Sequence, residues 1–240
     1  MTSFSSVLSH PWDLSPREAV ALQKSLAGRI IETDDFGELR YVAGIDIGWK
    51  RGDEKAKAAA AVLTYPELEL ADWAAAEWEI TFPYVPGLLS FREVPAALEA
   101  LAKLKIRPDL LLCDGQGRAH PRRFGLACHI GLLTGLPAIG VAKSRLCGQF
   151  GNLPERKGSS APLTDRGEII GLVLRSRTGV KPLFVSVGHR IGLATAKEVV
   201  LRCVTRYRLP ETTRWAHRIA SEGVCPQNSS IFSKDSAHVR

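Results

Sequence analysis

Apolar residues along the chain first alternate with polar ones and later form short continuous runs. The alternation in the first third predicts three strands joined by short turns, which is typical of an antiparallel meander. The later runs predict strands that are buried on both faces and separated by helices. The predicted strands are, in order, residues 39–47, 58–65, 68–80, 109–113, 138–141, 168–174 and 183–187.

Apolar positions at helical spacing predict five helices around these strands. They cover residues 16–32, 95–104, 122–134, 195–206 and 213–222, with Thr213 expected as the N-cap of the last. Three strands followed by strand–helix alternation predict an α/β fold, a mixed sheet with helices on its faces. We expect one catalytic domain over residues 1–222. The chain after Gly223 is polar and aperiodic, so residues 223–240 are expected to form a flexible tail.

Composition excludes several classes of protein. The chain has 240 residues, 45% hydrophobic and 24% charged, so it is not disordered throughout and needs no disulfide or metal to build a core. No apolar run approaches the roughly 18 residues of a membrane span, and the first residues lack the pattern of a secretory signal. Five cysteines without a CxxC pair support neither a disulfide framework nor a zinc ribbon, and they fit a reducing cytoplasm.

Asp46 is a candidate ligand near the end of the first predicted strand. Strand alternation places it on one face with Val42, Gly44 and Gly48. The two glycines leave open space in which a metal or a phosphate could approach the carboxylate. A turn aspartate at a strand end is an equally weighted alternative.

Two further carboxylates stand beside predicted elements. Asp114 ends a buried strand ahead of a Gly-Gln-Gly turn, and ligands gather at the carboxyl ends of strands in open α/β sheets. A turn or capping role is the alternative. Glu93 follows Ser90 at capping-box spacing, but Pro95 would then be the fifth helical residue and would break a hydrogen bond. The helix therefore starts later or is kinked, and capping does not fully explain Glu93.

These three carboxylates suit Mg²⁺, with Mn²⁺ as the expected substitute, because hard divalent cations prefer oxygen ligands. If the carboxylates converge at one sheet edge, such ions can activate a water and stabilise the leaving oxygen of a phosphodiester. The net charge of +7 favours an acidic partner such as nucleic acid, although many basic proteins bind no polyanion.

Basic side chains follow the same turns. His120, Arg122 and Arg123 come after the Asp114 turn, and the guanidinium fork matches phosphate geometry. Cations at a helix start oppose the helix dipole, which favours a functional reason for them over a structural one. Lys143 follows a buried strand, where it could contact a scissile phosphate or be a solvated surface charge.

Tyr84 and His217 are the remaining candidates. Residues 83–87 form a rigid loop that presents Tyr84 between two prolines, and this rigidity lowers the entropy cost of holding a protruding ring. Such a ring can wedge between bases, or it can pack on the protein's own surface. His217 falls off the apolar face of the last predicted helix, which leaves a surface role and a catalytic role equally open.

Six segments between about residue 42 and residue 217 carry the most distinctive patterns: VAGIDIGW, FPYVPGLLSFRE, DGQGRAHPRRFGLACHIG, IGVAKSRLCG, PLFVSVGHR and RLPETTRWAH. Together they resemble the endonuclease V family of inosine-specific nucleases. The resemblance covers most of the chain, and the combination of segments is highly specific. It implies a ribonuclease H-like fold, whose order of elements is the one predicted above.

The resemblance also implies an activity. The enzyme would recognise deoxyinosine in DNA, or inosine in RNA in some members. It would cut the second phosphodiester bond on the 3′ side and leave 3′-hydroxyl and 5′-phosphate ends. The length of the chain is sufficient for a monomer.

The resemblance further implies residue roles. The metal ligands would be Asp46, Glu93 and Asp114, with His120 and Lys143 near the scissile phosphate and Tyr84 as the wedge. The base pocket would be shaped by Gly87, Leu89, Gly115 and Gly125. The phosphate contacts would include Arg122 and Arg123. Gln116 stands where many relatives carry His, and His217 stands where some carry Asp.

Two other function classes remain open. A structure-selective nuclease of the same fold, such as a ribonuclease H or a junction resolvase, would cut without inosine. A basic binding domain would use Arg122, Arg123 and Lys143 for phosphate contacts alone and would show salt-dependent binding without cleavage. A labelled duplex with a single deoxyinosine, incubated with Mg²⁺ or with EDTA, separates the three.

Overall fold

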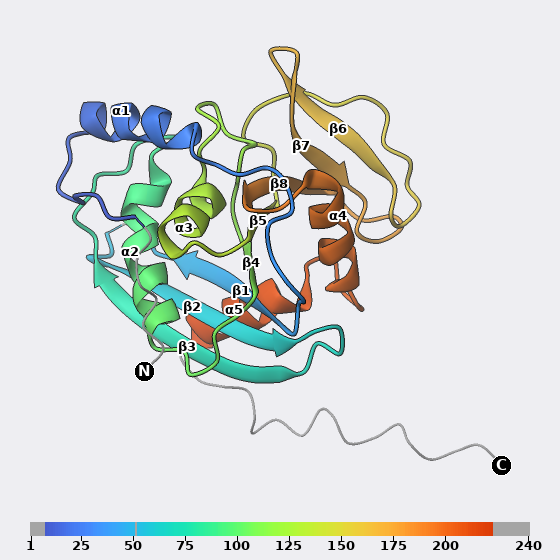
Figure 1. Ribbon diagram of the computed structural model, residues 1–240, viewed down its shortest axis with the longest axis horizontal. Helices are drawn as coiled ribbons and strands as arrows, with labels where there is room; N and C mark the ends of the chain where they lie inside the picture. Colours follow the sequence, from blue (N-terminus) through green and yellow to red (C-terminus); the bar gives the residue numbers. More distant parts are fainter. Residues whose placement is uncertain (1–7, 51, 223–240) are drawn as a thin grey trace.

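A mixed eight-stranded sheet forms the centre of the computed structural model, which describes residues 8–50 and 52–222 (Figure 1). The predicted α/β class is confirmed. The strands are β1 (Tyr41–Gly48), β2 (Lys55–Thr64), β3 (Leu70–Glu79), β4 (Leu110–Cys113), β5 (Ala138–Ala142), β6 (Ser160–Asp165), β7 (Glu168–Leu174) and β8 (Leu183–His189). The helices are α1 (Pro16–Ala27), α2 (Leu89–Ala102), α3 (Leu126–Thr134), α4 (Leu193–Arg202) and α5 (Glu211–Glu222). The predicted tail, residues 223–240, lies outside the described residues.

The strand order is β3-β2-β1-β4-β5-β8-β7-β6. Strands β1, β2 and β3 form the predicted antiparallel meander, whereas β1, β4 and β5 run parallel. The carboxyl ends of β1 and β4 therefore lie side by side, and the Asp114 backbone N–H donates to the Ile45 carbonyl (2.9 Å). This register brings Asp46 and Asp114 to the same edge of the sheet.

Helices cover both faces of the sheet, and the alternation along β1 decides which side chains they meet. Ala43 and Ile45 pack in one cluster with residues of α2 and α3. Val42 packs in a second cluster with residues of α4 and α5. Helix α1 lies across α2 and α3 (Figure 1). Its Ala19 packs in a small cluster with Phe91 of α2, and its Leu26 packs in another with Cys128 of α3. None of the helices within 8–50 and 52–222 is long and apolar enough to cross a membrane.

The boundaries of two helices differ from the sequence expectation. Helix α1 ends at Ala27, five residues early, because Gly28 caps it. Helix α2 begins at Leu89 and contains Pro95, so it starts well before the predicted residue 95. Leu88 is its N-cap and makes no side-chain capping bond, so a Ser90 capping box is not formed. Glu93 is therefore free of that structural role.

Later elements also differ. Helix α3 begins at Leu126, so Arg122 and Arg123 precede it and the argument from the helix dipole does not apply to them. Helix α4 ends at Arg202, four residues before its predicted end. Helix α5 begins at Glu211, which places Thr213 inside the helix, where its Oγ1 donates to the Pro210 carbonyl (3.1 Å). Strand β6 was not predicted.

Candidate active site

Three carboxylates from separate elements meet near the ends of β1 and β4. Asp46 lies on β1, Asp114 follows β4, and Glu93 comes from the second turn of α2. Asp46 and Glu93 are each only 7% exposed. Burying a carboxylate is costly unless it is paired, binds a metal or is protonated, so their gathering at one edge favours a cationic partner.

Burial and neighbouring carboxylates make Asp46 and Glu93 harder to ionise. Burial raises the pKa of Asp46, and the adjacent Asp114 raises that pKa further, while His217 opposes the effect. Burial raises the pKa of Glu93 to about 7, with added contributions from the charges of Asp46 and Asp114. Perturbed carboxylates of this kind cluster at functional sites.

Basic and polar side chains complete the surroundings. Lys143 Nζ forms an ion pair with Asp114 Oδ2, and His217 Nδ1 lies 3.1 Å from Asp46 Oδ2. Trp49 Nε1 donates a hydrogen bond to Glu93 Oε1 (3.1 Å). Each carboxylate thus contacts a basic or polar side chain. Lys143 follows β5, and His217 lies on α5.

The donor set fits a hard divalent cation in its chemistry. As the side chains stand, no three His, Cys, Asp or Glu residues in the described part of the chain enclose an ion-sized position. Lys143 pairs with Asp114 Oδ2, and Trp49 donates to Oε1 of Glu93. Mg²⁺ and Mn²⁺ prefer carboxylate oxygens as ligands, and a bound cation would offset the repulsion between neighbouring carboxylates. Binding would require Asp114 to exchange its contact with Lys143 for the cation, while the hydrogen bond from Trp49 can continue to orient Glu93.

A cavity of about 420 Å³ opens beside these groups. Its lining includes Glu93, Asp114 and Lys143, together with the four residues expected to shape a base pocket, which are Gly87, Leu89, Gly115 and Gly125. The volume falls within the roughly 300–1,000 Å³ typical of small-molecule pockets. Glu93, Asp114 and Lys143 therefore share one cavity with the candidate base pocket.

The glycines of this cavity serve the packing of the protein's own backbone. A Cβ on Gly125 would overlap the Gln116 carbonyl, and a Cβ on Gly115 would press on Leu126. Gly87 has a φ of +78°, a conformation that L side chains rarely adopt. Small residues here let the loops that form the wall of the cavity pack closely, and the expected base pocket stays a prediction.

Both ring nitrogens of His120 have backbone partners. Nδ1 accepts from the Arg122 N–H (3.2 Å), so the proton is on Nε2, which donates to the Gly87 carbonyl (3.0 Å). Burial, helped by the charge of Arg122, lowers the pKa of His120 to about 4. The neutral ring thus supports the Gly87 loop and also lines the cavity, and its expected place near a scissile phosphate stays a prediction.

Arg122 and Arg123 also bond inside the protein. Arg122 donates to Gln23 Oε1 and to the Gly87 carbonyl, each at 2.5 Å. Arg123 pairs with Glu168 (2.7 Å) and Asp165 (2.9 Å) at the β6–β7 turn. Both guanidiniums thus bond to protein acceptors, and their expected contacts with phosphates stay a prediction.

Tyr84 is 62% exposed and stands on an aromatic support. The centroid of its ring lies 5.7 Å from that of Trp49. The Arg92 guanidinium in turn lies over the Trp49 ring, 4.1 Å from its centroid. The ring protrudes at the cavity, whose lining includes Tyr84. The expectation of a presented aromatic is met in its geometry.

The sequence interpretation missed two residues of this site, Trp49 and Gln23. Trp49 contacts both Tyr84 and Glu93. Gln23, on α1, is 1% exposed and donates to the carbonyls of Gly87 (3.1 Å) and Phe124 (3.0 Å). A tryptophan three residues after Asp46 was the available signal for the first, while nothing local to α1 pointed to the second.

Comparisons with known sequences all find endonuclease V proteins. The sequence profile of the endonuclease V family matches residues 24–218. Endonuclease V of Rippkaea orientalis is 55% identical over 207 residues, which cover 86% of this chain and 90% of that protein.

Solved structures agree with the sequence comparisons. The crystal structure of the endonuclease V from Streptomyces avermitilis has a TM-score of 0.85 and 43% identity, over 90% of this chain and 96% of that one. A variant of Ciona intestinalis endonuclease V, solved in complex with a 23mer DNA containing an inosine followed by a ribo-adenosine, has a TM-score of 0.76 and 29% identity, over 88% of this chain and 98% of that one.

Proposed function

This chain belongs to the endonuclease V family, and we propose that its cavity receives the deoxyinosine of a damaged strand beside Asp46, Glu93 and Asp114. The protein is an endodeoxyribonuclease of DNA repair. It hydrolyses the second phosphodiester bond 3′ to the lesion and leaves 3′-hydroxyl and 5′-phosphate ends, and inosine in RNA is a further substrate to test. We expect it to act as a monomer in the cytoplasm.

One observation carries this proposal. The cavity that holds Glu93, Asp114 and Lys143 is also lined by Gly87 and Leu89 and has the exposed Tyr84 at its edge. A displaced base and the phosphodiester that follows it could occupy such a cavity together. Enzymes that act on a base in a duplex take it out of the stack, and an inserted aromatic fills the gap.

Asp46, Glu93 and Asp114 are the ligands that we assign to Mg²⁺, which, when bound, supplies Lewis-acid activation of water and stabilises charge on a leaving oxygen. Lys143 lies against Asp114, so its ammonium can turn to a phosphate oxygen once that carboxylate has another cation. His217 contacts Asp46 Oδ2 from the exposed side of α5 and orients that carboxylate.

His120, Arg122 and Gln23 have a positioning role in this proposal. All three bond to the Gly87 carbonyl, so they fix the loop that carries Tyr84 and Leu89 at the cavity. Arg123 joins the same region to the β6–β7 turn through Asp165 and Glu168. A loop fixed in this way can hold the wedge rigid while a strand is displaced.

A labelled duplex with one deoxyinosine tests the proposal. With Mg²⁺, the protein should produce one discrete cut one nucleotide past the lesion, and EDTA should abolish it. The same duplex with adenine should remain intact, which excludes a structure-selective nuclease. Binding without any metal-dependent product would contradict the proposal and favour a basic binding domain. A strand with a single inosine in RNA tests the further substrate.

A further inference from the structure

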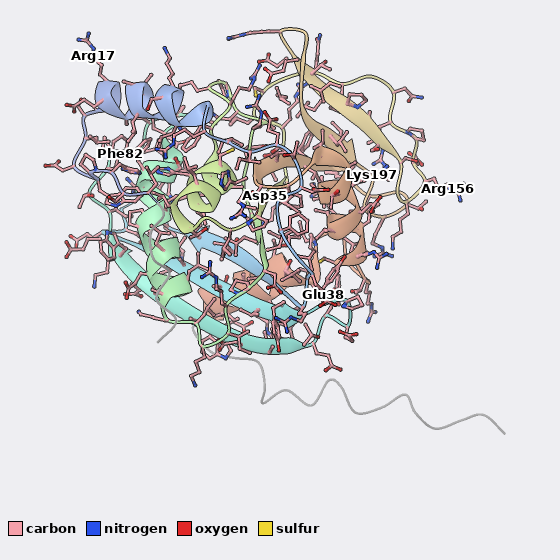
Figure 2. The ribbon with its side chains drawn as sticks, in the orientation of Figure 1. Arg17, Asp35, Glu38, Phe82, Arg156 and Lys197 are labelled. Carbon is pink, nitrogen blue, oxygen red and sulfur yellow. The ribbon has the colours of Figure 1, made fainter. Side chains whose placement is uncertain are left out.

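Five exposed cations gather on three loops beside the active site. The loops are residues 154–157, 175–182 and 204–209, and their sequences contain a single carboxylate, that of Glu155. We call this set the basic surface, and its members are Arg156, Lys157, Arg177, Lys181 and Arg206. Figure 2 shows Arg156 at the outer edge of the molecule, on the side of β6 and α4 and far from Arg17.

Hydrogen bonds join the three loops into one continuous surface. The Lys157 backbone N–H donates to Thr178 Oγ1 (3.1 Å), which links the first loop to the second. Arg177 donates to the Arg206 carbonyl, and Ser176 Oγ donates to the Arg208 carbonyl (2.7 Å), which links the second loop to the third. The three loops that carry the cations are therefore held together.

The charge of the basic surface is not neutralised within the described part of the chain. None of its five side chains lies within ion-pair distance of a carboxylate among residues 8–50 and 52–222. At the opposite end of the β6–β7 hairpin the situation is reversed, because Arg123 pairs with Asp165 and Glu168. Like charges kept together without counter-charges produce a positive potential that attracts polyanions.

The basic surface is connected to the catalytic cavity through Arg208. This half-buried guanidinium donates from Nη2 to the carbonyls of Lys143 (2.7 Å) and Pro182 (2.6 Å). Lys143 lines the cavity and pairs with Asp114, while Pro182 follows Lys181 of the basic surface. Arg208 thus joins the wall of the cavity at Lys143 to the loop that carries Lys181.

We propose that the basic surface binds the backbone phosphates of the nucleic acid that flanks the cleavage site. The inference rests on the proposed function for its choice of polyanion. Lysine and arginine contacts to phosphates carry no sequence information but add affinity and fix the register of the strand. The surface would thus lengthen the region of substrate that the enzyme contacts and would add affinity without changing the cleavage step.

A charge-matched pair of triple variants tests this surface. The test variant carries Arg156→Gln, Lys157→Gln and Arg177→Gln, and the control carries Arg17→Gln, Lys24→Gln and Lys55→Gln, which removes the same charge elsewhere. Binding to a deoxyinosine duplex in EDTA is measured by fluorescence anisotropy over a range of salt concentrations. For the test variant, the slope of log Kd against log salt should fall by about 0.9 for each phosphate that the protein no longer neutralises. The control should keep the wild-type slope.

Substrate length and cleavage provide the second measurement. The wild type should bind a duplex with long flanks more tightly than one with trimmed flanks, and the test variant should lose most of that advantage. Its single-turnover cleavage rate at saturating enzyme should remain wild-type. Because Arg177 bonds to a backbone carbonyl, the double variant Arg156→Gln/Lys157→Gln repeats the test with that hydrogen bond intact.

Two outcomes would overturn the inference: an unchanged salt slope in both test variants, or an equal loss in the control. Failure of the proposed function is distinguishable, because the wild type would then bind the duplex without cutting it at the lesion.

Discussion

Gly44 of β1 packs directly against the backbone carbonyl of Thr212 in α5. A Cβ at this position would overlap that carbonyl, so the absence of a side chain lets the helix approach the strand. The sequence had suggested that Gly44 leaves space for a ligand beside Asp46. The space is instead filled by α5, and this close approach brings His217 to within 3.1 Å of Asp46. Gly48, farther along the same face, does border open space.

Substitution Gly44→Ala should displace α5 and destabilise the protein by roughly 1–3 kcal/mol, the usual cost of overpacking a filled site. Thermal and urea unfolding measure the effect. Gly48→Ala is the matched control, because a methyl group there meets nothing within 4 Å. Equal stability of the two variants would mean that the packing between β1 and α5 is not tight.

Substitution Asp114→Asn should reduce Mg²⁺-dependent cleavage by at least about 1,000-fold, on the scale of losing one essential group of a catalytic unit. The amide keeps the shape of the carboxylate but removes the charge that binds a cation. Duplex binding in EDTA should be largely retained. Single-turnover cleavage measures the loss, and the exposed Asp13→Asn serves as the control. A cleavage rate near that of the wild type would remove Asp114 from the metal site.

Substitution Tyr84→Ala should slow cleavage of a duplex by about tenfold or more relative to a single strand with the same lesion. Stacking of a base on an aromatic ring contributes about 1–3 kcal/mol, and a wedge matters most where base stacking must be disrupted. Tyr84→Phe keeps the ring and should retain the wild-type ratio. Equal losses on both substrates would contradict the wedge.

Substitution Trp49→Phe should separate two roles of this indole. It keeps a ring against Tyr84 and Arg92 but removes the N–H that binds Glu93. We expect Mn²⁺ affinity, measured by calorimetry, to fall by about tenfold, as is typical when a group that orients a metal ligand is removed. The ratio of duplex to single-strand cleavage should stay unchanged.

Two further variants control the Trp49 measurement. Trp49→Ala should lower both the Mn²⁺ affinity and the cleavage ratio, because it also removes the support of Tyr84. Trp78→Phe, at a half-exposed tryptophan on β3, should change neither. If Trp49→Phe bound Mn²⁺ like the wild type, the hydrogen bond to Glu93 would have no part in metal binding.

Acidification should destabilise the fold through His189, whose pKa is lowered to about 4 by burial and by the charge of Arg190. The unfolded chain takes up a proton near pH 6.5, about the ordinary pKa of histidine, whereas the folded chain resists protonation until about pH 4. The contribution of neutral His189 to the free energy of unfolding is thus complete above about pH 6.5, and it is lost as the pH falls from about 6.5 to about 4.

His189→Asn isolates this contribution. The amide oxygen can still accept from the Ile31 N–H, as His189 Nδ1 does at 3.3 Å. On going from about pH 7.5 to about pH 5, the free energy of unfolding should decrease less for the variant than for the wild type. Parallel pH profiles of urea unfolding would show that His189 does not contribute.

The central strands were predictable because their apolar runs leave few alternatives. Residues 110–113, for example, are completely buried and could only be a strand between covered faces. Strand β6 was missed because its sequence, SAPLTD, is short and polar and contains Pro162. Proline is tolerated there since β6 is an edge strand, a property that depends on tertiary neighbours.

The proximity of Asp46 and Asp114 was predictable because both lie at strand ends, whereas the partners of the basic residues were not. Arg123 lies more than forty residues from Glu168, and Gln23 lies 99 residues from Arg122, so no local pattern could reveal either pair. Helix α2 passes through Pro95 despite the expected break, because its tertiary packing outweighs the missing hydrogen bond. The sequence thus located charged groups but not the roles that distant partners give them.

Gln23 has an implication for engineering. Its amide ties the first helix to the loop after β3 and to the segment that enters α3, through the carbonyls of Gly87 and Phe124. A shortened version starting at β1 would keep every strand and all three carboxylates, yet one wall of the cavity would lose its anchor. Such a truncation should blunt discrimination between lesion and normal base before it abolishes hydrolysis.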